Sequence, residues 1–191
     1  MQTTQGVELH RVAVNGTPAA PLEELHGDEP QLGYFVNGTR MFVQLPQPLA
    51  PGASATLDFA FGYDIPQQGA GGRMGHDSDN LVYLAYFHPR MAVLDDVVGW
   101  MVDPFLGPAE FYHGFGRYTY SVDVPAGWLV VGTGTHVNPQ ETLTDDVLAR
   151  LRRADQSDEI VNVIGAGEAA RATRPGRNGR LVWRFEADSV R

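Results

Sequence analysis

The chain has 191 residues, of which 43% are hydrophobic and 19% charged, and its formal net charge at pH 7 is −9. This composition is typical of a globular protein, and the acidic balance argues against binding to nucleic acid or to an anionic membrane surface. The absence of cysteine excludes disulfides, thiolate metal sites and a cysteine nucleophile.

The first elements are predicted to be two hairpins. Residues 7–14 alternate between apolar and polar side chains, which is the period of a half-buried strand. Asn15-Gly16 follows and favours a tight turn in which both central residues have positive φ. Residues 33–36 and 39–45 repeat the pattern on either side of Asn37-Gly38, so a second hairpin is expected there.

The middle of the chain is predicted to hold a long functional loop. Residues 55–63 alternate as a further strand, and residues 64–79 are a loop rich in glycine, glutamine and proline. The apolar run 81–87 predicts another strand. The segment 88–116 that follows is aromatic, acidic and irregular. Since long irregular loops in compact domains usually carry function, the functional residues are expected in this segment.

The C-terminal part is predicted to hold one short helix among strands. Residues 142–154 form the helix, with Asp145 and Asp146 in its first turn and arginines in its last. The predicted strands cover residues 118–124, 128–133, 160–164 and 180–187. Strands recurring at this spacing predict a mainly β fold, an antiparallel β-sandwich with one short helix, in a single domain covering residues 1–191.

A glycine-rich segment imitates a nucleotide-binding turn. Gly165-Ala166-Gly167 and Ala170 resemble the G-x-G-x-x-G/A motif, but Pro175-Gly176 breaks any following helix after about eight residues. A crossover that short cannot join parallel strands, so an antiparallel connection is predicted instead.

No catalytic centre is recognisable from the residues alone. The six histidines form neither an H-E-x-x-H motif nor any i, i+4 pair, so no metal site is predicted. Asp95 and Asp96 are a candidate carboxylate pair. Adjacent residues on a strand point to opposite faces, however, which makes one of the two a turn or cap residue.

The run 86–100, YFHPRMAVLDDVVGW, resembles the W-[YF]-P-R-x-x-V-Y-D-D-x-x-G-W segment of bacterial zinc metallopeptidases of the alanyl-aminopeptidase and leukotriene-hydrolase type. The similarity covers most of the chain. It continues through Leu106-Gly107, Glu110-Phe111-Tyr112, Val124-Pro125-Ala126-Gly127-Trp128, Gly132-Thr133-Gly134-Thr135, Asn138-Pro139, and Trp183 with Phe185 and Ala187.

The resemblance implies the N-terminal β-sandwich domain of such an enzyme, of saddle-like shape. In this family the zinc motif H-E-x-x-H and the G-x-M-E-N segment belong to a helical domain downstream, and neither occurs in this chain. The chain is therefore expected to be a non-catalytic fragment without a cofactor of its own. Zinc is expected in the catalytic domain, and a peptide is the expected substrate of the full-length protein.

Two functions remain open from the sequence. In the first, residues 95–112 dock on the catalytic domain and shape the substrate cleft, and the excised domain can self-associate through the same apolar face. In the second, the chain is a stand-alone β-sandwich module that binds a carbohydrate or another protein through exposed aromatic side chains. The candidate residues for the cleft or docking face are Tyr86, Arg90, Asp95, Asp96, Trp100, Phe105, Glu110 and Tyr112.

Overall fold

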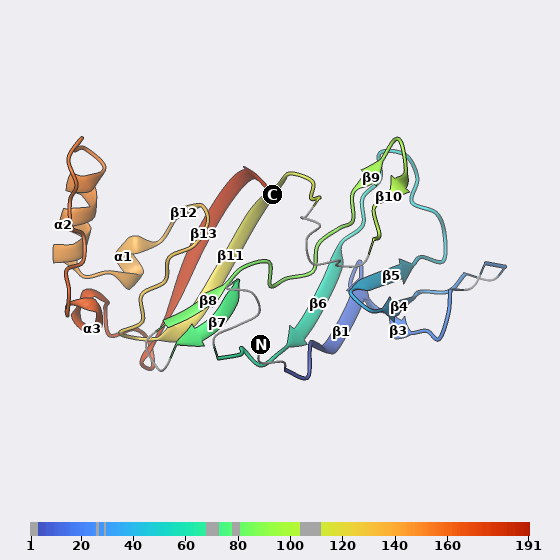
Figure 1. The fold of residues 1–191 in the computed structure, drawn as a ribbon, viewed down its shortest axis with the longest axis horizontal. Coiled ribbons are helices and arrows are strands. Elements are labelled where there is room, and N and C mark those ends of the chain that lie inside the picture. The colour runs from blue at the N-terminus through green and yellow to red at the C-terminus, as the bar shows by residue number, and fades with distance from the viewer. Residues whose placement is uncertain (1–3, 26, 29, 68–72, 78–80, 104–111) are drawn as a thin grey trace. The chain divides into compact units, whose positions relative to one another are not determined.

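The computed structural model describes residues 4–25, 27–28, 30–67, 73–77, 81–103 and 112–191 (Figure 1). Strands account for 39% of the structure and three helices for 11%, in several antiparallel sheets, which confirms the predicted mainly β fold. The chain divides into two compact units, Met1–Tyr112 and His113–Arg191. The assignment of residues 1–191 to one domain stays a prediction.

The main sheet of the first unit has the order β2-β1-β6. Its strands are β1 (Glu8–Val14), β2 (Thr17–Pro18) and β6 (Leu57–Gly62), all antiparallel. Asn15 and Gly16 have φ of 50° and 80°, so the predicted turn is confirmed. Val12, Ala13 and Val14 are buried in succession, which means that both faces of β1 are covered at this end.

The described residues of the first unit form three smaller sheets besides this one. Their strands are β3 (Ala20–Pro21), β4 (Gly33–Asn37) and β5 (Arg40–Gln44); β7 (Met74–Asp77) and β8 (Leu81–Leu84); β9 (Leu94–Asp95) and β10 (Gly99–Trp100). The β4–β5 turn lies one residue later than predicted, because Asn37 pairs with Arg40 and Gly38, with φ of 63°, takes the first loop position. The segment 64–79, predicted as a loop, contains β7.

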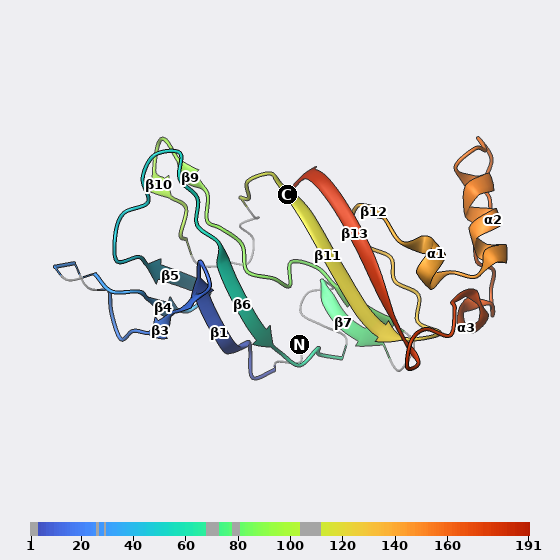
Figure 2. The same ribbon diagram turned by 180° about the vertical axis from the view of Figure 1, so that it is seen from behind.

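The second unit is built on a three-stranded antiparallel sheet of order β11-β13-β12. The strands are β11 (Gly116–Pro125), β12 (Thr135–His136) and β13 (Arg180–Val190), and Figure 2 shows β11 and β13 running side by side over their length. Side chains alternate between buried and exposed along β13. One face of the sheet is therefore the wall of a core and the other face is solvated.

Helices and loops cover the buried face of this sheet. The helices are α1 (Pro139–Thr142), α2 (Asp145–Ala154) and α3 (Ala169–Ala172). The predicted helix is confirmed as α2, with acidic residues in its first turn and arginines in its last. The core consists of Leu143, Val147, Leu148, Ala172, Leu181, Trp183 and Phe185. No helix in the described ranges is both long and apolar enough to cross a membrane.

Three predictions about the C-terminal part were wrong. The structure has two four-residue helices besides the single helix expected. The runs 128–133 and 160–164 contain no strand. Leu129, Val130, Val163 and Ile164 pack against the core instead, so these runs bury their apolar side chains without pairing as strands.

The glycine-rich segment forms no parallel crossover. The helix that follows Gly167 has only four residues, and β13 is antiparallel to both of its neighbours. The prediction that residues 165–180 form no parallel crossover is therefore confirmed, whereas the antiparallel connection expected from a strand at 160–164 is not formed, because that strand is missing.

Candidate docking surface

The aspartate pair lies in a small hairpin made by β9 and β10. Asp95 pairs with Gly99, whose φ of 79° closes the loop. One carboxylate oxygen of Asp95 accepts hydrogen bonds from the backbone N–H groups of Val97 (2.8 Å) and Val98 (3.2 Å). Asp95 is thus the turn residue expected of the pair, and Asp96 is exposed.

The same carboxylate connects the hairpin to the end of the first unit. The hydroxyl of Tyr112 donates to Oδ2 of Asp95 over 3.1 Å. The backbone N–H of Val97, the Tyr112 hydroxyl and the N–H of Val98 together lower the pKa of Asp95. The hydrogen bond to Asp95 and its negative charge raise the pKa of Tyr112. Both groups hold the protonation states that the bond needs at neutral pH.

Two further hydrogen bonds fix the segment that follows β10. The N–H of Met101 donates to the carbonyl of Val93 (2.9 Å), which extends the hairpin by one residue. Nη1 of Arg40 donates to the carbonyl of Val102 (3.0 Å). Because Arg40 belongs to β5, this bond connects the hairpin to the β4–β5 sheet of the same unit. Hydrogen bonds of backbone groups and of the polar side chains of Asp95, Tyr112 and Arg40 thus hold the hairpin in place.

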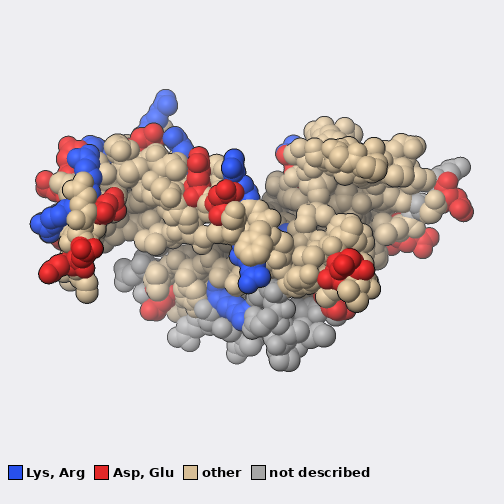
Figure 3. All heavy atoms as spheres, turned by 90° about the horizontal axis from the view of Figure 1, so that it is seen from above, with Lys and Arg blue, Asp and Glu red and all other residues tan. Residues whose placement is uncertain are grey.

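The hairpin presents apolar side chains to solvent. Val97 is 85% exposed, Val98 64% and Trp100 52%. Exposed Met91 and Leu94 precede them, and Tyr112 is half exposed. We call these six residues the hairpin face. Figure 3 shows few charged groups on the right-hand part of the surface, and most of those are acidic. Five of the six lie between residues 91 and 100, in and next to the hairpin, and large exposed apolar patches are typical of interaction sites in soluble proteins.

Tyr86 and Arg90 form a second pair of candidate residues. The guanidinium carbon of Arg90 lies 5.4 Å from the centroid of the Tyr86 ring, within cation–π distance. Tyr86 has φ of 56°, which is uncommon for a bulky residue. The strand predicted over 81–87 therefore ends at Leu84. The predicted site residues thus form two groups, one around Asp95 and one at Tyr86–Arg90.

Two of the predicted residues, Phe105 and Glu110, lie outside the described residues. Two other features were missed from the sequence. Exposed Leu94 and Met91 were not assigned to the site, although their place beside a turn-forming aspartate is a usable signal. The anchoring role of Arg40 had no sequence signal, because its partner is 62 residues away.

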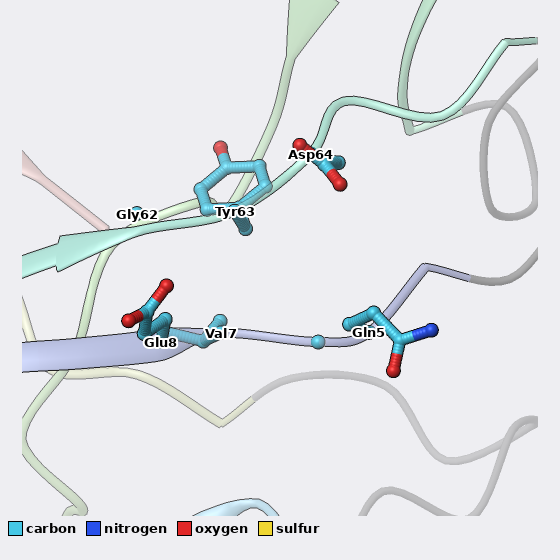
Figure 4. A pocket seen from close by; sticks show the side chains of 7 residues that line it. Gln5, Val7, Glu8, Gly62, Tyr63 and Asp64 are labelled. Carbon is cyan, nitrogen blue, oxygen red and sulfur yellow. The ribbon is translucent and has the colours of Figure 1, made fainter.

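Metal-binding clusters and pockets are the remaining features of interest in the described residues. In the ranges that the structure describes, no three His, Asp or Glu side chains gather closely enough to hold a metal ion. An open hollow of about 500 Å³ lies where β1 begins and β6 ends, and Figure 4 shows Glu8 on one of its sides and Tyr63 and Asp64 on the other. Burial raises the pKa of Tyr63. The described lining of this hollow contains two carboxylates and one tyrosine, and neither serine nor histidine.

No protein-family model, curated protein or solved structure matches this chain.

Proposed function

We propose that this chain is the non-catalytic N-terminal β domain of a zinc-dependent metallopeptidase, and that its hairpin face docks on the catalytic domain and shapes the substrate cleft. The observation that carries the proposal is the apolar, rigidly held hairpin in the segment with the strongest family resemblance. Zinc is assigned to the catalytic domain, since the sequence has no cysteine and no H-E-x-x-H motif.

The energetics support a docking role for the hairpin face. Each large apolar side chain that moves from water into an interface contributes ~1.5–3 kcal/mol. Val97, Val98 and Trp100 are each more than half exposed, so most of that contribution is still available. The hydrogen bonds to Asp95 hold the loop in one conformation, which reduces the entropy lost on binding.

The composition of the face favours a protein partner over a sugar. A carbohydrate site relies on aromatic platforms with polar groups around them. Four of the six side chains on the hairpin face, Met91, Leu94, Val97 and Val98, are aliphatic or thioether groups. Carbohydrate binding is kept as the second candidate, because Trp100 and Tyr112 are exposed aromatics in the same place.

The test is reconstitution of a two-piece enzyme. Residues 1–191 are co-expressed with the downstream region of the same reading frame, and co-purification and zinc-dependent aminoacyl hydrolysis are measured. We expect Val97→Asp and Val98→Asp to abolish co-purification. The matched control is Ile160→Asp, which places the same charge at a 97% exposed apolar residue of the second unit and should leave co-purification intact.

Two results would contradict the proposal. One is a downstream region without an H-E-x-x-H motif or zinc-dependent activity. The other is complex formation that survives both aspartate variants. If Trp100→Ala removes binding to an oligosaccharide while Val97→Asp does not, the carbohydrate module is the correct function.

A further inference from the structure

The long strand β11 has a paired edge and an open edge. Within the described residues β13 is its only strand neighbour, since the sheet order is β11-β13-β12. On the other edge of Gly116–Pro125, no strand of the described residues is paired with β11. An unpaired edge of this length presents a row of backbone donors and acceptors that can pair with another strand.

The register identifies which groups point outward. The N–H of Ala126 donates to the carbonyl of Gly179 (2.8 Å), and this bond continues the β11–β13 register beyond Pro125. Even-numbered residues of β11 therefore bond to β13, because backbone bonding alternates between the two sides of an antiparallel strand. The odd-numbered residues Arg117, Thr119, Ser121 and Asp123 direct their N–H and C=O groups away from β13.

Among the described residues, the protection of the β11 edge is limited to the charged residues Arg117 and Asp123 and to the guanidinium of Arg180, which donates to the carbonyl of Asp123. Natural edges carry lysine, an internal proline or a bulge, and this chain contains no lysine at all. Pro125 lies only at the end of β11. The register shift near Gly116 adds its extra residue to β13, where Ser189 has φ of 56°. The outward edge of β11 is regular from Arg117 to Val124.

We propose that two copies of this chain pair through β11, antiparallel and centred on Tyr120. In this register Arg117 lies opposite Asp123 of the second copy, and Thr119 lies opposite Ser121. By symmetry each pair occurs twice. The opposed residues are the odd-numbered ones whose backbone groups point outward, so each pair can exchange two backbone hydrogen bonds. The two opposite-charge pairs lie on the solvated face of the sheet.

The charges select this register over its neighbours. A slip of two residues in one direction sets Arg117 opposite Ser121, and a slip in the other direction sets it opposite Pro125. Both slips lose the charge pairs, and the second also loses a backbone donor. A slip of one residue opposes inward-bonded with outward-bonded groups, and so it forms no ladder.

Existing ion pairs leave these side chains accessible. Arg117 lies 3.5 Å from Asp188, and the two side chains are 77% and 68% exposed. Nε of Arg180 lies 3.0 Å from Oδ1 of Asp123, in a pair whose side chains are about half exposed. Exposed pairs of this kind contribute little, so exchange for a partner on the second copy is inexpensive. Nη2 of Arg180 also donates to the carbonyl of Asp123, which keeps a second lone pair for the ladder.

The first experiment measures dimerisation of residues 1–191 by sedimentation over a range of concentrations. We expect a weak, concentration-dependent dimer. Ser121→Pro removes an outward N–H of β11 and no hydrogen bond to β13, and it should abolish the dimer. Arg117→Asp should weaken it on the order of tenfold, and Arg117→Asp with Asp123→Arg should restore it. The control Glu186→Arg changes a charge on the same sheet face but on the central strand β13, and should have no effect.

The second experiment uses the absence of native cysteine. A mixture of Thr119→Cys and Ser121→Cys chains should form a disulfide dimer on mild oxidation, because directly opposed residues lie about 5.5 Å apart between Cα atoms. Each variant alone should cross-link far less, since its cysteines are then diagonal neighbours at roughly 7–8 Å.

Three outcomes would overturn the inference. The first is a chain that stays monomeric at every concentration. The second is a dimer that Val97→Asp removes and Ser121→Pro does not, which would assign self-association to the hairpin face. The third is protection of the amides of Thr119 and Ser121 from hydrogen exchange in the monomer, which would show that another segment of the same chain occupies the edge.

Discussion

Asn138 is expected to be the most sensitive polar residue of the second unit. It is 5% exposed and precedes α1, yet its side chain bonds to β13. Its Nδ2 donates to the carbonyl of Val182 (2.9 Å), and its Oδ1 accepts the N–H of Arg184 (2.8 Å). The side-chain amide thus continues the pairing of β13 beyond the end of β12. The substitution Asn138→Ala removes this continuation.

The expected loss of stability comes from the two backbone groups that lose their hydrogen-bond partner. Asn138→Ala leaves the carbonyl of Val182 and the N–H of Arg184 without their partner. An unsatisfied buried backbone group costs about 1–3 kcal/mol. Partial entry of water lowers the total, so a loss of about 2–4 kcal/mol in the unfolding free energy is expected. The control Gln140→Ala, at an exposed residue of α1, should change the unfolding free energy by less than about 0.5 kcal/mol.

The assay is urea unfolding followed by tryptophan fluorescence in a Trp100→Phe background, so that only Trp128 and Trp183 of the second unit report. A second variant sharpens the test. Asn138→Asp keeps an acceptor for Arg184 but places a carboxylate beside the carbonyl of Val182 and near Glu141. It should be less stable than Asn138→Ala at pH 7 and should recover in acid, since a protonated carboxyl can donate again. An Asn138→Ala protein as stable as the Gln140→Ala control would refute this reasoning.

Three other predictions concern titration and local order. Burial lowers the pKa of His136 below its ordinary 6.5. As the pH drops below about 6.5, the unfolded chain therefore binds this proton before the folded chain does, and the unfolding free energy should fall. Urea unfolding of the wild type and of His136→Gln at pH 7.5 and 5 should show a smaller decrease in the variant. Asp95→Asn should lower the pKa of Tyr112 towards its ordinary 10.0, measured by NMR titration against Tyr112→Phe, because the charge of Asp95 contributes to the raised value. Oε2 of Glu168 accepts the N–H of Gly165 over 2.8 Å, so Glu168→Ala should accelerate hydrogen exchange at Gly165, while Glu168→Gln should keep part of the protection.

Local signals predicted the elements that depend on local chemistry. Asn15-Gly16 turns the chain with both φ values positive, and helix α2 begins and ends with the charges that its dipole favours. The strand predicted over 128–133 failed for a non-local reason. Its apolar residues have the right composition, but Leu129 and Val130 pack against the core, and β13, much later in the sequence, is the strand that pairs with β11.

The candidate site could be predicted only in part. The sequence marked Asp95 and Trp100, and the turn role expected of one aspartate is found in Asp95. The contact between Asp95 and Tyr112 spans 17 residues, and that between Arg40 and Val102 spans 62. No periodicity or spacing rule connects residues so far apart, because such pairs are fixed by tertiary packing.

In the hairpin, the groups that stabilise the conformation differ from the side chains that are available for binding. Its conformation depends on backbone groups and on polar residues, namely the Asp95 carboxylate, the Tyr112 hydroxyl and the Arg40 guanidinium. Val97 and Val98 contribute their N–H groups to that framework and leave their side chains in water. Substitutions of these side chains should therefore change binding without unfolding the hairpin. Asp95→Ala should instead disorder the hairpin, although it removes none of the apolar residues. The polar groups thus fix the conformation of the hairpin and the apolar side chains provide the surface to be buried, an arrangement that is well suited to contact a partner.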